Sequence, residues 1–276
     1  MNCTIHYIQD PRLKPYVQYV LFNHGKKGKT VREVVSFANT NICLGILKNF
    51  SMAESAEGVK TLVKRPGITS YLSGLYSAPH RLVPHEEQDE ICIDFTPLGY
   101  YRFLSVSAKK YILNEDVLQE AFGKDAPAFF ENVFCEQSFL QRGLMIEKFL
   151  LSKLKVFSNP LLENALHYIH ETHGEIKVSE LARKLNEYEK KLHRYFTSYF
   201  DINLQEYLRI VRFRAALRLL KNGQHNFTRL AHDCSYYDQS HFIREMKYFT
   251  NLTPSQCRSE LRSIDDTVVI RFVNVR

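Results

Sequence analysis

Two related stretches decide the fold of the second half of this chain, and the first of them reads VSELARKLNEYEKKLHRYF from Val178 to Phe196. The second reads FTRLAHDCSYYDQSHFIREMK from Phe227 to Lys247. Leu-Ala at 181 and 230 align at an offset of 49, whereas the later Leu-His-Arg and Phe-Ile-Arg align at 50. Each stretch has the pattern of a short helix, a tight turn and a second helix, so we call them the first unit and the second unit. The offsets predict one extra residue in the second turn.

The residues around each turn suit a helix-turn-helix. Such a motif needs a small residue where its helices cross, and Ala182 and Ala231 meet that need. It also needs a turn residue that tolerates positive φ, for which Asn186 is better suited than Ser235. N-cap chemistry is expected from Ser179, followed by Glu180, and from Asp238.

The second helix of each unit separates into a buried and an outward face. Leu192 and Phe196, and likewise Phe242 and Met246, are spaced four residues apart and should face the core. The side chains expected to point outward are Lys190, His193, Arg194, Gln239, Ser240, Ile243 and Arg244.

These outward side chains have the chemistry that reads base pairs. Arginine can bond guanine through two hydrogen bonds, glutamine can do the same with adenine, and an aliphatic side chain can contact a thymine methyl group. Lysine and serine are equally suited to phosphate, and a solvated position without a partner is the alternative for His193. We predict that these positions contact DNA.

The charge of the chain is concentrated in the two units. The chain carries 37 Lys and Arg against 30 Asp and Glu, and residues 177–258 hold 15 of the former and 8 of the latter. The whole net charge of +7 therefore lies in this segment, while the rest of the chain is balanced. A cationic surface favours a polyanion because binding releases counterions. A solvated helical face with a chance excess of basic residues is the alternative.

A third helix is predicted between the units, from Leu204 to Leu220, with one apolar face and several arginines elsewhere. At the α-helical rise this run is about 25 Å long. A connector of that length can hold two reading helices near the roughly 34 Å that separates successive major-groove faces.

The segment from Leu162 to Arg258 resembles the arabinose-regulator (AraC/XylS) family of transcription factors. The motifs that carry the resemblance are Leu181-Ala182, Leu192 to Phe196, Gln205 to Leu208, Asp238 to Arg244 and Leu252 to Ser255. The resemblance implies a seven-helix domain with two helix-turn-helix units, major-groove contacts at the seven outward positions named above, and contact with RNA polymerase. The segment departs from the family pattern at Tyr188, Asp201, Asn251, Ser235 and Cys257.

The first part of the chain has a different pattern. Short β-like runs such as 31–37, 41–47 and 90–95 are separated by turn signals, which favours a sandwich or small barrel. Residues 11–22 show helical spacing, with a bent strand as the alternative. This part weakly resembles the sensor domains that accompany the family.

Helices are expected again beyond residue 97. Asn114 is the expected N-cap of a helix at 115–122, and another helix is expected from Asp125 to Phe134. A long helix at 138–154 should pack on the first domain; contact with a second subunit and a role in the core alone are the two alternatives for the rest of its apolar face. Pro160 suits the first turn of the next helix, so a domain boundary is placed just before it.

The expected fold class is therefore α+β, in three parts. Residues 1–156 form a β-rich, sensor-like or dimerisation domain with trailing helices, and residues 157–262 form an all-α domain with two helix-turn-helix units joined by a linker helix. Residues 263–276 form an extension whose β-branched residues predict a strand. That strand should pair with the sheet of the first domain, in the same chain or in a partner.

Other classes of function find little support. The six cysteines are scattered and are expected to be reduced thiols. His80, His85, Glu86, Glu87, Asp89 and Glu90 are dense in potential metal ligands, but their spacing favours a solvated loop. No catalytic elbow, phosphate-binding loop or cofactor motif is present, and the sequence has neither a leader pattern nor an apolar run long enough for a bilayer. We expect a cytoplasmic protein with no metal, cofactor, catalytic residues or membrane partner.

The leading hypothesis is a sequence-specific DNA-binding regulator, activator or repressor, controlled through a small-molecule effector or homodimerisation in the first domain. A protein-interaction module whose double unit no longer binds DNA is the alternative. An enzyme fused to a DNA-binding domain, as in some methyl-transfer repair proteins, comes third because no cysteine has an activating neighbour in sequence.

Overall fold

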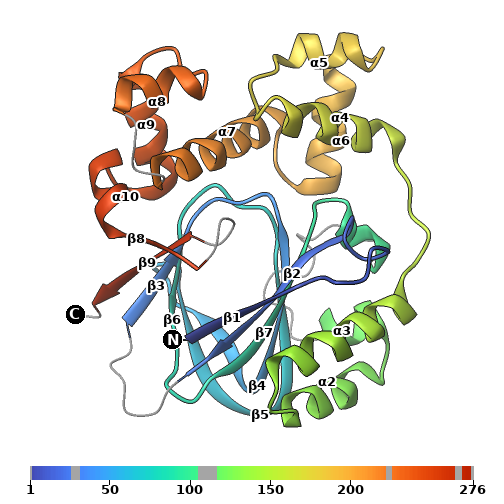
Figure 1. Cartoon of the computed structure of the whole chain (residues 1–276). Coiled ribbons are helices and arrows are strands. Elements are labelled where there is room, and N and C mark those ends of the chain that lie inside the picture. Colours follow the sequence, from blue (N-terminus) through green and yellow to red (C-terminus); the bar gives the residue numbers. More distant parts are fainter. Residues whose placement is uncertain (1, 26–31, 105–116, 222–225, 265–268, 275–276) are drawn as a thin grey trace.

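The computed structural model describes residues 2–25, 32–104, 117–221, 226–264 and 269–274. Their largest element is a nine-stranded sheet with the order β1-β2-β7-β4-β5-β6-β3-β9-β8, curled into a half-barrel (Figure 1). Its strands are β1 (Asn2–Tyr7), β2 (Val17–His24), β3 (Arg32–Ser36), β4 (Ile42–Glu54), β5 (Val59–Ser73), β6 (His80–Val83), β7 (Asp89–Phe95), β8 (Leu261–Ser263) and β9 (Val269–Asn274). All neighbouring strands are antiparallel except β5 and β6.

The two faces of the sheet have different environments. Because side chains alternate along a strand, Val20 and Phe22 on β2 join a core outside the barrel, whereas Tyr19 and Leu21 line its inside. On β7, the outward face is apolar in the same way, but Glu90 and Asp94 point inward. The half-barrel therefore has an apolar convex face and a concave face with buried polar groups.

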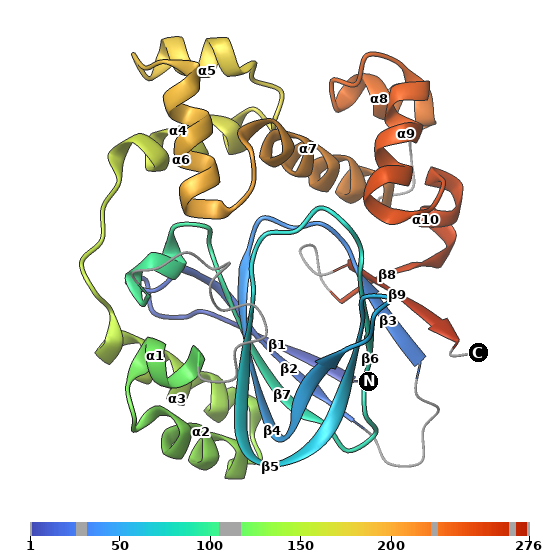
Figure 2. The same ribbon diagram turned by 180° about the vertical axis from the view of Figure 1, so that it is seen from behind.

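Helices cover the convex face and one end of the half-barrel (Figures 1 and 2). Near β1 and β5 are α1 (Val117–Phe122), α2 (Ala126–Cys135) and α3 (Phe139–Lys153). The rest are η1 (Gly99–Arg102), α4 (Pro160–Glu171), α5 (Val178–Lys184), α6 (Glu189–Phe200), α7 (Leu204–Lys221), α8 (Phe227–Asp233), α9 (Gln239–Thr250) and α10 (Pro254–Glu260). The long helix α7 crosses the open end of the half-barrel and connects α4–α6 with α8–α10. The α+β fold class is confirmed.

The expected helix at residues 11–22 is wrong. Residues 11–16 form turns, and β2 begins at Val17. Both faces of β2 are buried, one against the helices and one inside the half-barrel, so its apolar residues do not alternate with polar ones. The alternative of a strand was the correct one from Val17 onward.

The helices expected after residue 97 are present. Asp125 precedes α2, Ser138 caps α3 by accepting a hydrogen bond from the Gln141 amide, and Pro160 opens α4. The helix expected at 115–122 is observed from Val117, while its proposed N-cap, Asn114, lies outside the described residues.

The expected strand after residue 263 is confirmed as β9. It pairs antiparallel with β3 of the same chain, from Arg32 opposite Asn274 to Ser36 opposite Ile270, and with β8 on its other side. Residues 265–268 and 275–276 of that expectation lie outside the described residues.

Two large apolar cores do not divide at residue 157. The first core runs from the convex face of the sheet through α1–α3 to α4–α6 and the start of α7. The second core joins the rest of α7 and α8–α10 to Val35, Phe37 and Ala38 beside the half-barrel and to Val269 on β9. The sheet therefore contributes side chains to the packing of both helical units.

Candidate nucleic-acid interface

The first unit is a helix-turn-helix formed by α5 and α6. Leu181 and Ala182 are buried, which lets the helices approach closely. Asn186 has φ 52°, and the next amide, of Glu187, donates to the Ala182 carbonyl oxygen at 2.9 Å. The expected turn position is therefore confirmed. The expected N-cap at Ser179 is wrong, because α5 begins earlier, after Lys177, so that Ser179 lies within the helix.

The second unit, α8 and α9, repeats this geometry. Ser235 has φ 51°, and the Tyr236 amide donates to the Ala231 carbonyl oxygen at 2.8 Å. The Asp238 side chain accepts from the His241 amide at 2.6 Å, which confirms it as the N-cap of α9. Serine thus adopts the same left-handed conformation as Asn186, although it does so less readily.

The extra residue of the second turn can be located. The turns match up to Glu187 and Tyr236, after which one residue, Tyr188, precedes α6 but two, Tyr237 and Asp238, precede α9. Tyr188 and Tyr237 are 82% and 93% exposed, which is unusual for side chains of this size. Each unit therefore presents a tyrosine beside the start of its second helix.

The seven predicted contact residues lie on α6 and α9. Leu192, Phe196, Phe242 and Met246 are fully buried, as their spacing predicts, so the remaining faces of both helices point outward. Exposed among the seven are Lys190, Arg194, Gln239, Ser240 and Arg244; His193 and Ile243 are half-buried. Ile243 also packs against the second core.

Neighbouring side chains restrict one of the seven. The Thr228 hydroxyl donates to Oε1 of Gln239 at 2.8 Å, which occupies one lone pair of that oxygen and leaves its second lone pair and the amide nitrogen for a base edge. By contrast, no ion pair joins Arg194 or Arg244 to another residue that the structure describes.

Hydrogen bonds hold helix α7 to the turn before α5 and to α9 of the second unit. The Arg212 guanidinium donates to the Gly174 carbonyl oxygen at 2.8 Å, at the turn that follows α4. Nη2 of Arg209 donates to Oε1 of Glu245 on α9 at 2.8 Å, and Nη1 of Arg209 donates to Glu206 at 2.5 Å. The Arg209 guanidinium also lies 4.4 Å from the Tyr248 ring centre. The orientation of α9 against α7 therefore depends on a charged contact.

Sequence reasoning missed two features of this region. The contact between Arg209 and Glu245 has no local signal, since the residues lie on different helices. The exposed tyrosines are the second feature. For Tyr188 the sequence does contain a local signal, because this residue stands where the family pattern has a small hydroxyl residue.

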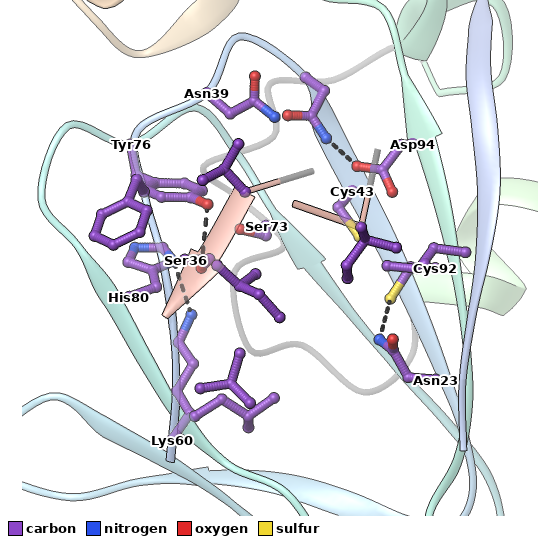
Figure 3. Close-up of a pocket in the computed structure, with 18 of the residues that line it drawn as sticks. Asn23, Ser36, Asn39, Cys43, Lys60, Ser73, Tyr76, His80, Cys92 and Asp94 are labelled. Atoms are coloured by element: carbon purple, nitrogen blue, oxygen red, sulfur yellow. Dashed lines mark hydrogen bonds between the residues drawn. The ribbon is translucent and has the colours of Figure 1, made fainter. Parts of the chain in front are cut away.

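A cavity of about 180 Å³ lies inside the half-barrel (Figure 3). Its floor is polar: the Asn23 amide nitrogen donates to Glu90 at 2.9 Å, the Tyr71 hydroxyl donates to Glu90 at 2.7 Å, and Asn41 donates to Asp94. A volume of this order accommodates a small organic molecule, since a 150 Å³ apolar cavity can hold benzene.

The cavity disfavours charge. Burial, together with the neighbouring Lys60, lowers the pKa of His80 to about 4. Burial also lowers the pKa of Lys60 and raises that of the Glu90 carboxyl. All three shifts favour the neutral form of the side chain.

The expected solvated loop at 80–90 is wrong for His80, Asp89 and Glu90, because His80 lies on β6 and the other two on β7, and Glu90 is only 1% exposed. His80 lines the cavity, whereas the Asp89 carboxylate pairs with the Arg142 guanidinium at 2.9 Å on the helical side. No group of three or more His, Cys, Asp or Glu that could hold a metal occurs among the described residues. Nor does any described helix combine the length and hydropathy that a bilayer crossing requires.

Comparison with known proteins identifies the double unit. Residues 181–260 match a family model described as a helix-turn-helix domain. The Msm operon regulatory protein of Streptococcus mutans is 24% identical over 123 residues, which are 43% of this chain and 44% of that protein. The match therefore spans less than half the length of this relative.

Two solved structures are also similar. A transcriptional regulator with an AraC-type DNA-binding domain, from Chromobacterium violaceum, is 21% identical and covers 36% of this chain and 90% of its own, with a TM-score of 0.34. ToxT of Vibrio cholerae, bound to an unsaturated fatty acid, is 12% identical and covers 92% of both chains, with a TM-score of 0.39. At these TM-scores neither a ligand nor a partner transfers to this chain.

Proposed function

We propose that this chain, whose residues 181–260 match a helix-turn-helix family model, is a sequence-specific DNA-binding transcriptional regulator. Its two units would read two adjacent segments of the major groove, with α6 in one and α9 in the other. The observation that carries the proposal is the matched turn geometry, φ 52° at Asn186 and 51° at Ser235, which presents both helices in the same way.

The contacts proposed with DNA are those of the seven outward residues. Arg194, Gln239 and Arg244 have the hydrogen-bonding groups for base edges, and Ile243 offers an aliphatic surface for a thymine methyl group. Lys190 and Ser240 would bind base or phosphate, as would His193. The exposure of the polar side chains and the lack of a carboxylate at either arginine support these roles.

We further propose a division of labour within the chain. Residues 1–156 act as a sensor or dimerisation domain, residues 157–262 bind DNA, and residues 263–276 form an extension. The cavity inside the half-barrel supports control by a small molecule, and a homodimer is the other route of control. Location in the cytoplasm, contact with RNA polymerase and the lack of enzymatic activity remain part of this proposal.

The test is footprinting of genomic fragments with the full chain, followed by binding measurements at several salt concentrations. We expect protected sites that span two adjacent major-groove segments and an affinity that falls as salt rises. Arg194→Ala combined with Arg244→Ala should abolish protection, whereas Lys124→Ala, an exposed site in the first domain, should not. Binding that is absent or insensitive to salt would favour the alternative, a protein-interaction module with degenerate DNA binding.

A further inference from the structure

Strand β9 separates the cavity from the core of the second unit. Ile270 is 5% exposed and lines the cavity, opposite Ser36 of β3, which lines it too. On the other face of the same two strands, Val35 and Val273 pack into the second core with α7–α10. Because side chains alternate along a strand, one thin wall contacts both compartments.

The wall is continuous with the second unit in the chain as well. Helix α10 ends at Glu260 and β8 begins at the next residue, Leu261, which is buried in the second core. The Arg271 guanidinium on β9 forms an ion pair with the Glu260 carboxylate at 2.5 Å. β9 is therefore connected to the end of α10 both through β8 and through this ion pair.

Other parts of the helical half reach the cavity too. Arg214 of α7 and Ile264, just after β8, contribute to its lining. The cavity is therefore lined by the earlier strands of the half-barrel, by β9 with the residue after β8, and by the linker helix α7.

The lining indicates the kind of occupant. Hydroxyl, amide and carboxyl groups of Ser36, Ser73, Asn39, Asn41 and Glu90 provide hydrogen-bonding partners, while Ile270 and Val34 provide apolar surface. Two other charged lining residues have partners, since Arg81 pairs with Glu33 at 2.6 Å and Asp94 accepts a hydrogen bond from Asn41. Burial disfavours the charged forms of His80, Lys60 and Glu90. A molecule with hydroxyl or amide groups and no net charge satisfies such a lining without leaving a buried charge unpaired.

We propose that the β8–β9 hairpin is one wall of a binding site for a small uncharged polar molecule, and that through this wall the occupancy of the cavity is transmitted to the second helix-turn-helix unit. The proposal deepens the proposed function, on which it depends only for the effect on DNA. Its structural part is tested without DNA, so that the two can fail separately.

The first experiment fills the cavity with a larger side chain on β5, a strand that lines the cavity but does not pair with β9. Ser73 lines the cavity on β5, which is not adjacent to β9 in the sheet, so Ser73→Trp can reach the hairpin only through the cavity. Hydrogen exchange of the full chain should slow about ten-fold in both β9 and α10, as expected for added contacts, and remain unchanged in α5 and α6. Ser73→Leu serves if the larger side chain prevents folding.

The matched control is Val63→Trp, on the same strand but exposed and outside the cavity lining. It should leave exchange in β9 and α10 unchanged. Slower exchange confined to β5 and its neighbours, or a response in β9 that does not extend to α10, would overturn the proposal.

The second experiment tests the wall and the class of occupant with defined probes. Thermal unfolding is measured with uncharged polyols and sugars (xylitol, myo-inositol, glucose) and with charged counterparts (gluconate, glucosamine). We expect at least one uncharged probe to raise the Tm of the chain. The substitution Ile270→Ala should weaken the binding of that probe about ten-fold. The control Arg262→Ala, at an exposed position on β8, should leave the binding unchanged. Stabilisation by charged probes alone or by none, or unchanged binding to Ile270→Ala, would overturn the assignment.

Finally, Ser73→Trp should change the affinity for a footprinted DNA site at least about three-fold, while Val63→Trp should not. A chain that binds no DNA would remove the proposed function but leave both structural tests intact. If Ser73→Trp binds DNA with the affinity of the unsubstituted chain, the proposed transmission from the cavity to the second unit is refuted.

Discussion

Arg209 of α7 and Glu245 of α9 form a two-pronged contact, with Nη2 at 2.8 Å and Nε at 3.2 Å from Oε1, although Glu245 lies on the helix that carries the proposed base-reading residues. The Glu245 side chain is only 9% exposed. Helix α9 is thus held to α7 through a buried carboxylate, while its opposite face is exposed to solvent.

Removal of either partner should destabilise the second unit. Arg209→Ala should lower the free energy of unfolding by about 1–3 kcal/mol, because the Glu245 carboxylate, 9% exposed, is left buried without this partner. Glu245→Ala should cost less, because Arg209 is 32% exposed and keeps its bond to Glu206. The double variant should lose less than the sum, which a double-mutant cycle in denaturant measures. Arg229→Ala, which breaks an exposed pair with Asp233, is the control and should change stability by less than about 1 kcal/mol. Strict additivity would contradict the coupling.

Arg244→Ala should weaken binding to a footprinted site by about 1–3 kcal/mol and relax the preference at one base pair. The reason is the loss of a guanidinium that no described carboxylate neutralises. Titration against a panel of single-base variants measures both effects. The same affinity loss across every variant would assign Arg244 to phosphate, and unchanged affinity would remove it from the interface.

The two turns should respond differently to glycine. Ser235→Gly should stabilise the chain by roughly 0.5–1 kcal/mol, because Ser235 has φ 51° and glycine adopts this conformation without strain. Asn186→Gly is the matched control and should have little effect, since asparagine already tolerates φ 52°. Ser235→Val should be destabilising. The free energy of unfolding in denaturant measures these effects. An equal increase in Ser235→Gly and Asn186→Gly would refute the explanation.

The starts of the two reading helices should also differ. Tyr188 makes no side-chain cap on α6, so Tyr188→Ser should stabilise the chain by about 1 kcal/mol. Asp238→Ala should destabilise it by about 0.5–2 kcal/mol through loss of the bond to the His241 amide. Thermal unfolding of both variants tests this prediction: the Tm should rise in Tyr188→Ser and fall in Asp238→Ala.

Stability should fall as the pH is lowered from about 6.5 to about 4. The pKa of His80 is lowered to about 4 in the folded chain by burial and by Lys60, so over this window the unfolded chain binds more protons. His80→Gln should flatten the dependence, leaving the contributions of His24 and His170, whose pKa values are also lowered by burial. His232→Gln, at an exposed position, should not change it. An unaltered profile in His80→Gln would exclude this residue.

The local features of the helical half could be predicted from sequence. Turn residues, small crossing residues and the spacing of Leu192 and Phe196 are determined within a few positions, and the structure reproduces them. Errors arose where distant contacts decide. β2 lost its alternation because both of its faces are covered. The N-cap of α5 was instead a local error, since Lys177 rather than Ser179 precedes the helix.

The proposed site shows the same limit. The seven outward positions follow from helical phase, whereas the partner of Glu245 depends on how α7 and α9 pack. The sequence predicted that the last segment is a strand, but it left open whether this strand pairs with the same chain or with a partner. The residues of an edge strand do not specify which strand lies beside it, and the structure shows that β9 pairs with β3 of the same chain.

The pairing of β3 with β9 has a consequence for synthesis of the protein. While the ribosome makes α1 to α10, β3 has β6 on one side and an open edge on the other, because β9 has not yet been translated. Such an edge is a template for wrong pairing between nascent chains, and closing it requires contact across most of the chain length. Chains that terminate before β9 should therefore aggregate, so only a chain translated through the second unit can close the half-barrel.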